Sequence, residues 1–405
     1  MSKWRTYKLG ELVTIKGGKR LPKGVLLQSA PNHHPYIRIR DLGKTRILEL
    51  DSTYEYVDDI TQKSIARYVV EKGDILLSIV GTIGLIGIVG ESLHLANQTE
   101  NCVKLINLKT VDRLYLYYYL SSTIGQIEIQ KGIVGAVQAK LPIKNIENIE
   151  ISLPPLTEQK RIADILSAID DKIELNRRIN ANLEQQAQAL YKSWFVDNKK
   201  DDWKEVPLSE VADFVGGYSY KGNELVESSM TAMATIKNFE RKGGFKVDGF
   251  KDIVASNKLK AEHHANLFDL LVAHTDLTQN ADVIGNAEML LTFDKYSDII
   301  FSMDLVKVLP KQTFPYKYLL AALLKNPHFK KHCMGYVNGT TVLHMSKKAL
   351  PEYVINLPSA EEIQSMDNAF KAYYLKMAEI LQENNSLSTL RDTLLPKLMS
   401  GEIKV

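Results

Sequence analysis

The sequence predicts an α+β protein in which two related globules, rich in short strands and loops, are separated by two long antiparallel coiled-coil helices. Three observations lead to this fold class: an internal repeat, two long segments with heptad spacing of apolar residues, and a proline boundary before each of these segments. A chain of 405 residues also exceeds the size of one ordinary core, so more than one domain is expected.

The repeat is visible as short paired segments at a nearly constant separation. The pairs are Trp4–Gly18 with Trp203–Gly217, Ile39–Leu42 with Ile236–Phe239, Gly73–Ser78 with Phe268–Ala273, Val103–Leu105 with Val306–Val308, and Leu153-Pro154 with Leu357-Pro358. A fixed internal repeat means that one structural unit is used twice. We expect the paired segments to form the frame of each globule and the unlike segments between them to form surface loops.

Each globule is predicted to consist mainly of short strands. Apolar runs bounded by glycine or polar clusters occur at Ile75–Val80, Leu85–Val89, Val103–Ile106 and Leu270–Ala273. One helix is expected at Leu114–Ser121, with its counterpart at Tyr316–Leu324. The glycine-rich run SIVGTIGLIGIVG, which overlaps the first two of these segments, has neither P-loop nor dinucleotide-binding spacing, and predicts a strand–turn–strand instead.

Prolines set the domain boundaries. Pro154-Pro155 ends the first globule and Pro358 ends the second, and each precedes a predicted helix start. Ser359 with Glu362 has the spacing of a capping box, which supports a helix start at that point. The expected domains are therefore a first globule (1–155), a central helix (156–197), a second globule (198–358) and a C-terminal helix (359–405).

The heptad spacing identifies the seam of each helix. The seam residues are Ile162, Leu166, Ile169, Ile173, Leu183 and Leu190 in the first helix, and Met366, Phe370, Met377, Leu387, Leu394 and Leu398 in the second. A period of 3.5 residues is typical of a coiled coil, and the first seam is about 50 Å long at 1.5 Å per residue. Because the second globule lies between the helices in sequence, an antiparallel pair related by a pseudo-twofold axis is expected.

Asparagines interrupt the seam near its centre. Asn176 and Asn180 lie in the first helix and Asn384 in the second. Antiparallel pairing centred on the heptads would bring Asn176 close to Asn384, where a buried asparagine pair would fix the register at some cost in stability. The alternative is a widened, hydrated part of the seam.

Charge and side-chain chemistry favour nucleic acid as a partner over a structural scaffold. Basic residues are concentrated between Lys16 and Arg46, a distribution that suits a polyanion, although a solvated basic edge would look the same. Arg38 and Arg40 would alternate on one strand and share a face. Candidate DNA-binding residues are Lys16, Lys19, Arg20, Lys23, Arg38, Arg40, Lys44, Arg46, Gln138, Lys140, Tyr218, Tyr220, Lys221, Lys237, Asn238, Thr275, Gln279, Asn280, Asn338, Thr340, Thr341 and His344.

No catalytic residues and no metal ligands are predicted. The sequence offers no convincing nucleophile–base or paired-carboxylate set. His328 and His332, beside Cys333, have helical ligand spacing, but a surface helix face is the preferred interpretation because there is no matching ligand pair. The two cysteines, one in each half, are typical of reduced thiols in a cytoplasmic protein, and no membrane-spanning segment is expected.

Specific segments resemble a known family. LPPLTEQKRIADILSAIDDKIELNRRINANLEQQAQALYKSWFVD, GDILLSIVGTIG, AHTDLTQNADVIG and LRDTLLPKLMSGEI are similar to segments of the specificity subunits of type I restriction–modification systems. The resemblance covers nearly the whole chain. The helical spacer and the C-terminal segment are its most specific parts.

The resemblance implies that each globule is a target recognition domain reading one half of a bipartite, asymmetric site in double-stranded DNA. It implies two methyltransferase subunits as partners, with restriction subunits as further partners. S-adenosylmethionine, ATP and Mg would be bound by those partners and no cofactor by this chain, which would be non-catalytic. Two alternatives stay open: a coiled-coil scaffold, and a recognition fragment of a fused restriction–modification enzyme.

Overall fold

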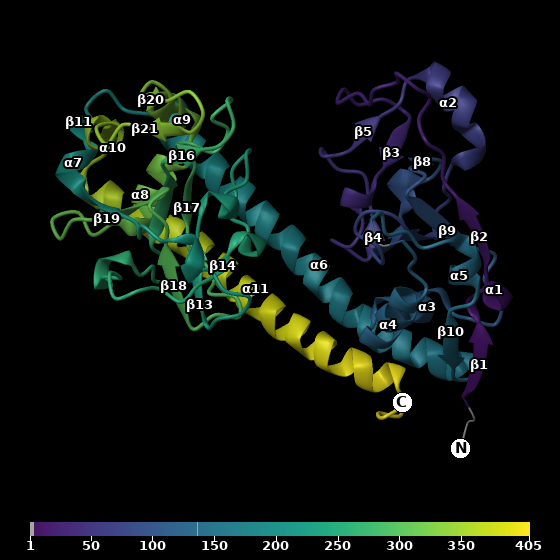
Figure 1. Ribbon diagram of the computed structural model, residues 1–405. Helices are drawn as coiled ribbons and strands as arrows, with labels where there is room; N and C mark the ends of the chain where they lie inside the picture. Colours follow the sequence, from purple (N-terminus) through teal and green to yellow (C-terminus); the bar gives the residue numbers. More distant parts are fainter. Residues whose placement is uncertain (1–3, 136) are drawn as a thin grey trace. The chain divides into compact units, whose positions relative to one another are not determined.

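The polypeptide divides into two compact units. The computed structural model describes residues 4–135 and 137–405. Unit 1 comprises Met1–Glu174 and Leu387–Val405, and unit 2 comprises Leu175–Ser386. Each unit therefore contains one strand-rich globule together with segments of both long helices, α6 (Leu156–Lys192) and α11 (Ala360–Met399) (Figure 1).

Unit 1 is built from short strands and short helices besides the long ones. Its strands are β1 (Arg5–Lys8), β2 (Thr14–Gly17), β3 (Pro35–Ile37), β4 (Ile47–Leu48), β5 (Glu55–Tyr56), β6 (Ile75–Ser78), β7 (Ile86–Val89), β8 (Asn97–Gln98), β9 (Cys102–Ile106) and β10 (Glu150–Leu153). Its helices are α1 (Leu9–Leu12), α2 (Asp59–Ile65), α3 (Arg113–Ser121), α4 (Thr123–Lys131) and α5 (Ile143–Glu147).

Unit 2 repeats this plan. Its strands are β11 (Lys204–Pro207), β12 (Ala212–Gly216), β13 (Thr231–Ala234), β14 (Lys251–Asp252), β15 (Leu270–Ala273), β16 (Thr275–Asp276), β17 (Ala287–Met289), β18 (Asp298–Phe301), β19 (Leu305–Pro310), β20 (Val337–Asn338), β21 (Leu343–Met345) and β22 (Val354–Leu357). Its helices are α7 (Leu208–Val211), α8 (Lys317–Leu324), α9 (Pro327–Met334) and α10 (Ala349–Glu352).

The strand pairing explains the internal repeat. The order β2-β9-β6-β7 in unit 1 matches β12-β19-β15-β17 in unit 2, and the pair β1-β10 matches β11-β22. A third matching sheet, β5-β3-β8, has its counterpart in β14-β13-β18. The strand–turn–strand predicted for the glycine-rich run is confirmed, because Leu77 of β6 pairs with Ile86 of β7. The repeated segments thus specify a common frame.

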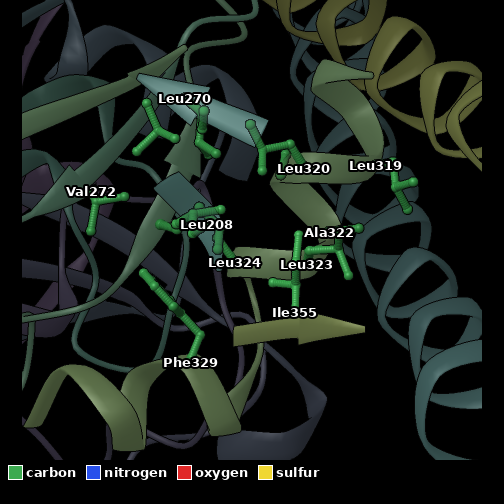
Figure 2. Close-up of a cluster of buried hydrophobic side chains, with 14 of the residues drawn as sticks. Leu208, Leu270, Val272, Leu319, Leu320, Ala322, Leu323, Leu324, Phe329 and Ile355 are labelled. Carbon is green, nitrogen blue, oxygen red and sulfur yellow. The ribbon is translucent and has the colours of Figure 1, made fainter. Parts of the chain in front are cut away.

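The helix that follows the last strand of the core sheet packs between that sheet and the long helices. In unit 2, α8 is apolar on all sides, and Leu319, Leu320 and Leu323 are buried. Figure 2 shows Leu323 beside Ile355 of β22, and Leu319 on the side of α8 that faces the long helices. Each fully buried leucine contributes about 1.5–3 kcal/mol relative to an exposed one, so this helix is a large part of the core.

The long helices run antiparallel within each unit. In unit 2 the amide of Asn176 contacts Asn384, whereas Trp194, in the π-helical turn that directly follows α6, packs edge-on against Phe370, earlier in α11. In unit 1 the side chain of Asp170 binds Arg391, and Ile162 shares an apolar cluster with Leu398. Residues later in α6 therefore contact residues earlier in α11, as in an antiparallel pair.

The seam is shared between the helices and the globules. Each predicted seam residue is buried or half-buried. Ile162 and Leu166 belong to the same apolar cluster as Tyr115 of α3, and Phe370 belongs to the cluster that contains Leu208 of α7. The seam residues therefore hold each globule on the helices as well as joining one helix to the other.

The predicted asparagine pair is confirmed. Asn176, only 1 % exposed, donates from Nδ2 to Asn384 Oδ1 at 2.9 Å and to Glu383 Oε2 at 2.8 Å. A buried amide in an apolar seam is stable only where it has such partners, so the pair favours this register over its neighbours.

Candidate nucleic-acid interface

A small three-stranded sheet gathers most of the polar candidates of unit 2. Strand β21 pairs with β20 on one side and with β16 on the other, so that His344 lies opposite both Asn338 and Thr275. In Figure 1, β16, β20 and β21 lie together beside α9. Because β20 and β21 form a tight hairpin, the residues at its tip project from the globule.

Gly339 makes the hairpin turn possible. Its φ is +120°, and an added Cβ would lie 2.2 Å from the carbonyl oxygen of Val342. Only glycine adopts this conformation without severe strain. The turn therefore depends on the residue type at this position.

A buried aspartate shapes the neighbouring loop. Asp276 is 4 % exposed, and its Oδ1 accepts hydrogen bonds from the backbone N–H and the hydroxyl of Thr278. Its Oδ2 accepts from the backbone N–H of Val283 at 2.9 Å. At the loop tip, Gln279 Nε2 donates to the carbonyl of Thr340 at 2.6 Å. The loop and the hairpin tip are therefore joined into one surface.

This surface, which we call the unit 2 hairpin surface, combines amide, hydroxyl, imidazole and apolar groups. Its exposed residues are Leu277, Gln279, Asn280, Asn338, Thr340, Thr341 and His344. Amides and hydroxyls can hydrogen-bond base edges, and an apolar side chain can contact a thymine methyl group. Leu277, 66 % exposed, was missed in the sequence analysis; a single leucine within a polar loop is the signal that could have found it.

Positive charge lies beside the unit 2 hairpin surface. Burial lowers the pKa of His274, and the positive charges of His344 and Lys347 lower it further. Lys347 and Lys348 are exposed. A cationic surface next to hydrogen-bonding groups is suited to phosphates flanking a base-reading element.

Unit 1 has a corresponding hairpin. Lys140 forms bridges with Val134 and with Val80, as His344 does with Asn338 and Thr275. Gly135 takes the role of Gly339, with φ of +96° and the carbonyl of Gln138 only 2.6 Å from an added Cβ. The exposed residues Val137, Gln138 and Lys140 form the unit 1 hairpin surface. Its side chains differ from those of unit 2.

The basic residues of unit 1 do not all have the same environment. Lys16, Lys19, Arg20, Lys23 and Lys44 are exposed. Arg20 binds Glu100 at 2.9 Å, and the ammonium of Lys19 lies 5.7 Å from the ring centre of Tyr68. Such solvent-exposed pairs are weak and can exchange for phosphate contacts.

The expectation that Arg38 and Arg40 alternate on one strand is wrong. Strand β3 ends at Ile37, and Arg40 lies in a 3-10 turn, Ile39–Asp41. The backbone N–H of Arg38 donates to Asp41 Oδ2 at 2.7 Å, which closes the turn. Both guanidinium groups nevertheless reach Glu55, each at 2.8 Å.

Four further candidates have structural contacts in the interior. Asn238 is fully buried and closes the turn that matches Ile39–Asp41: its Oδ1 accepts from the N–H of Thr235 and its Nδ2 donates to the carbonyl of Lys246. Thr275 is buried in β16, and Tyr218 is buried with its hydroxyl bonded to Glu224. Asn238, Thr275 and Tyr218 are therefore part of the interior of the globule, and not the DNA contacts that the sequence predicted.

Arg46 is the fourth of these residues. Its guanidinium side chain is 11 % exposed, donates to the Tyr118 hydroxyl at 3.0 Å and forms an ion pair with Asp171 of α6. Of the remaining candidates, Lys221 and Lys237 are exposed, and Tyr220 is half-buried beneath the ammonium of Lys251.

The histidine–cysteine group on α9 has ordinary structural contacts. His332 Nε2 lies 2.8 Å from the carbonyl oxygen of Ala349, and Cys333 is buried, which raises the pKa of its thiol to about 12. Within residues 4–135 and 137–405, no cluster of three or more histidine, cysteine or acidic side chains is arranged to hold a metal ion. Nor does that part of the chain contain a helix long and apolar enough to span a membrane.

Comparisons with known proteins show which chains this one is similar to. Residues 1–185 match the family model of the type I restriction modification DNA specificity domain. The specificity subunit of the type I restriction enzyme MjaVIII from Methanocaldococcus jannaschii is 25 % identical, over 99 % of this chain and 93 % of the relative. That of HindI from Haemophilus influenzae is 23 % identical over all of both chains.

A solved structure has the same fold. The S subunit of a type I restriction–modification system from M. genitalium superposes with a TM-score of 0.53 at 18 % identity. The match covers 98 % of this chain and 96 % of the other.

Proposed function

We propose that this chain, which is similar over its whole length to specificity subunits of type I restriction–modification systems, is such a subunit and reads a bipartite and asymmetric sequence in double-stranded DNA. Residues 1–155 would read one half-site and residues 198–358 the other. The segments 156–197 and 359–405 would act as the spacer between them. The chain itself would carry out no chemistry.

One observation supports this proposal most directly. Both units carry a glycine-turned hairpin in the same place of the same frame, and the exposed side chains of the two hairpins differ. Unit 1 offers Val137, Gln138 and Lys140, whereas unit 2 offers several amides and hydroxyls from its hairpin and from the adjoining loop. Two identical readers about a pseudo-twofold axis would favour a palindrome, and two unlike readers favour an asymmetric target.

The exposed basic residues support the same proposal. Exposed groups that could bind phosphates are provided by Lys16, Lys19, Arg20, Lys23 and Lys44 of unit 1 and by Lys347 and Lys348 of unit 2. Such groups position a protein on the duplex, while base contacts select the sequence. We therefore assign affinity mainly to the lysines and arginines, and selectivity mainly to the hairpin surfaces.

Specificity subunits of type I systems work in complexes with DNA and modification subunits. We propose that this chain directs two methyltransferase subunits, and restriction subunits where the cell has them, to its target in the cytoplasm. S-adenosylmethionine would then be bound by the methyltransferase subunits, and ATP and Mg by the partner subunits.

Mapping methylated adenines tests the proposal. The chain is co-expressed with its modification subunits in cells lacking other adenine methylation, and the genomic DNA is sequenced with base-modification detection. We expect one motif with two unlike half-sites separated by a fixed number of unspecified base pairs. Unchanged DNA, together with salt-insensitive or absent binding of the purified complex to duplexes, would instead favour a coiled-coil scaffold.

A further inference from the structure

A buried charge network joins the unit 2 globule to helix α6. Lys325, which follows α8, contacts Glu288 of β17 at 2.5 Å and Glu184 of α6 at 3.0 Å. The side chain of Glu288 is 4 % exposed and also accepts a hydrogen bond from the backbone N–H of Gly244. Burial alone would lower the pKa of Lys325, but the carboxylates of Glu288 and Glu184 outweigh it and raise the pKa.

A second network joins the unit 1 globule to both long helices. Tyr118 of α3 donates its hydroxyl to Asp170 Oδ2 of α6 at 2.6 Å. The other oxygen of Asp170 accepts from Arg391 of α11 at 3.0 Å. Arg46, in the loop before β4, donates to the same tyrosine and pairs with Asp171.

The two networks use the same heptad position of α6. Asp170 follows the seam residue Ile169, and Glu184 follows the seam residue Leu183, so both lie directly after a seam residue and are two heptads apart. The seam residues around them provide apolar contact, which is non-directional and tolerates small sliding or rotation. Charged hydrogen bonds have a defined geometry and do not tolerate such sliding or rotation.

We propose that Asp170 and Glu184 are positioning residues that fix the placement of each recognition globule on the long helices, and thereby the number of base pairs tolerated between the two half-sites. This inference rests on the proposed function. The hairpin surfaces then determine which bases are read, whereas the two carboxylates determine which spacer length between the half-sites is accepted.

Each network contains a carboxylate that can be replaced without leaving a buried charge unpaired. In Glu184→Ala, Lys325 keeps Glu288, so its ammonium stays neutralised inside unit 2. In Asp170→Ala, Arg391 keeps Asp392 at 2.8 Å and Arg46 keeps Asp171. Alanine is the best helix former, so α6 itself is preserved.

A matched control lies on the other long helix. Glu379 of α11 pairs with Lys376 one turn earlier, and both side chains are exposed. Glu379→Ala removes the same kind of carboxylate from a long helix, but from an exposed pair within that one helix. Any effect of merely removing one negative charge from a long helix is therefore present in this control.

The experiment measures spacer preference with the full complex of this chain and its modification subunits. Duplexes carry the mapped half-sites with the spacer lengthened or shortened by one or two base pairs, and binding is followed by fluorescence anisotropy. We expect the wild-type preference for one spacer length over its neighbours to fall about tenfold in Glu184→Ala and in Asp170→Ala. Discrimination against a changed half-site base should stay at the wild-type level, and Glu379→Ala should behave as wild type.

Two results would overturn the inference. One is a wild-type spacer profile in both variants, and the other is a loss of base discrimination equal to the loss of spacer preference. If Glu184→Ala fails to assemble, Glu184→Gln, which keeps the side-chain volume, carries the same expectation. A wild-type complex that reads no two-part site would overturn the proposed function itself, an outcome distinct from failure of the variants.

Discussion

Replacing Gly339 by alanine tests whether the unit 2 hairpin contacts DNA. The backbone at this position has φ of +120°, and the new Cβ would lie 2.2 Å from the Val342 carbonyl oxygen. Holding an L-residue in such a conformation costs about 1–3 kcal/mol. Because the turn is exposed, the free protein can relax it and lose little stability.

The strain energy of Gly339→Ala should therefore appear as weaker binding to DNA. A complex that needs the native turn must restore it, together with the hydrogen bond from Gln279 to the Thr340 carbonyl. An energy of about 1–3 kcal/mol corresponds to roughly 5- to 150-fold weaker binding. We expect this loss for a duplex carrying both mapped half-sites, measured by fluorescence anisotropy at fixed salt.

The matched control is Gly222→Ala in the same globule. Gly222 has no positive φ, and an added Cβ there meets no atom within 4 Å, so binding should be unchanged. The counterpart Gly135→Ala should weaken reading of the other half-site instead. If Gly339→Ala bound its target as tightly as Gly222→Ala, the hairpin would not be part of the interface.

Three further substitutions test other parts of the structure. Ser359→Ala should lower helix stability by about 1 kcal/mol because Ser359 and Glu362 form a capping box, and a thermal midpoint equal to wild type would contradict this. Hydrogen bonds from Lys200 and from Ser359 lower the pKa of Glu362 to about 2. The stabilising effect of the Glu362 carboxylate should therefore be complete above the pKa that this group has in the unfolded chain, and should disappear as the pH falls through 2. Asn176→Ala removes two buried hydrogen bonds and should cost about 2 kcal/mol, visible as faster hydrogen exchange in α6; unchanged exchange would refute the role of the pair. Lys23→Gln should reduce the slope of log affinity against log salt by roughly 0.9 if Lys23 contacts one phosphate, and an identical slope would exclude that contact.

The sequence predicted the frame well because the frame is repeated. The apolar runs gave strands β6, β7, β9 and β15, and the heptads gave the long helices with the register that brings Asn176 to Asn384. Both signals are periodic and extend over many residues. Local irregularities therefore had little influence on them.

Individual site residues were harder to place. Arg38 and Arg40 have the alternation of a strand, yet Asp41 closes a 3-10 turn after β3, and Asn238 does the same in unit 2. The spacing of the capping residue was present in the sequence, but a short polar motif is equally compatible with a surface loop. Burial of Thr275 and of Tyr218 depends on distant strands and could not be inferred locally.

The charge networks at the globule–helix junctions were also not predictable. Arg391 lies within the predicted C-terminal helix, and Arg46 was recognised only as one of several basic residues. Their partners, Asp170 and Asp171, lie far away in sequence, so the pairing arises only from the tertiary fold.

Exchanging the first globule tests the central claim most directly. Residues 1–155 are replaced by the corresponding globule of a relative with a different target, and methylated adenines are mapped after co-expression with the modification subunits. We predict a motif in which one half-site changes while the other half-site and the spacer length stay as in the wild type. A motif changed in both halves, or unchanged in both, would contradict the claim that each globule reads its own half of the target.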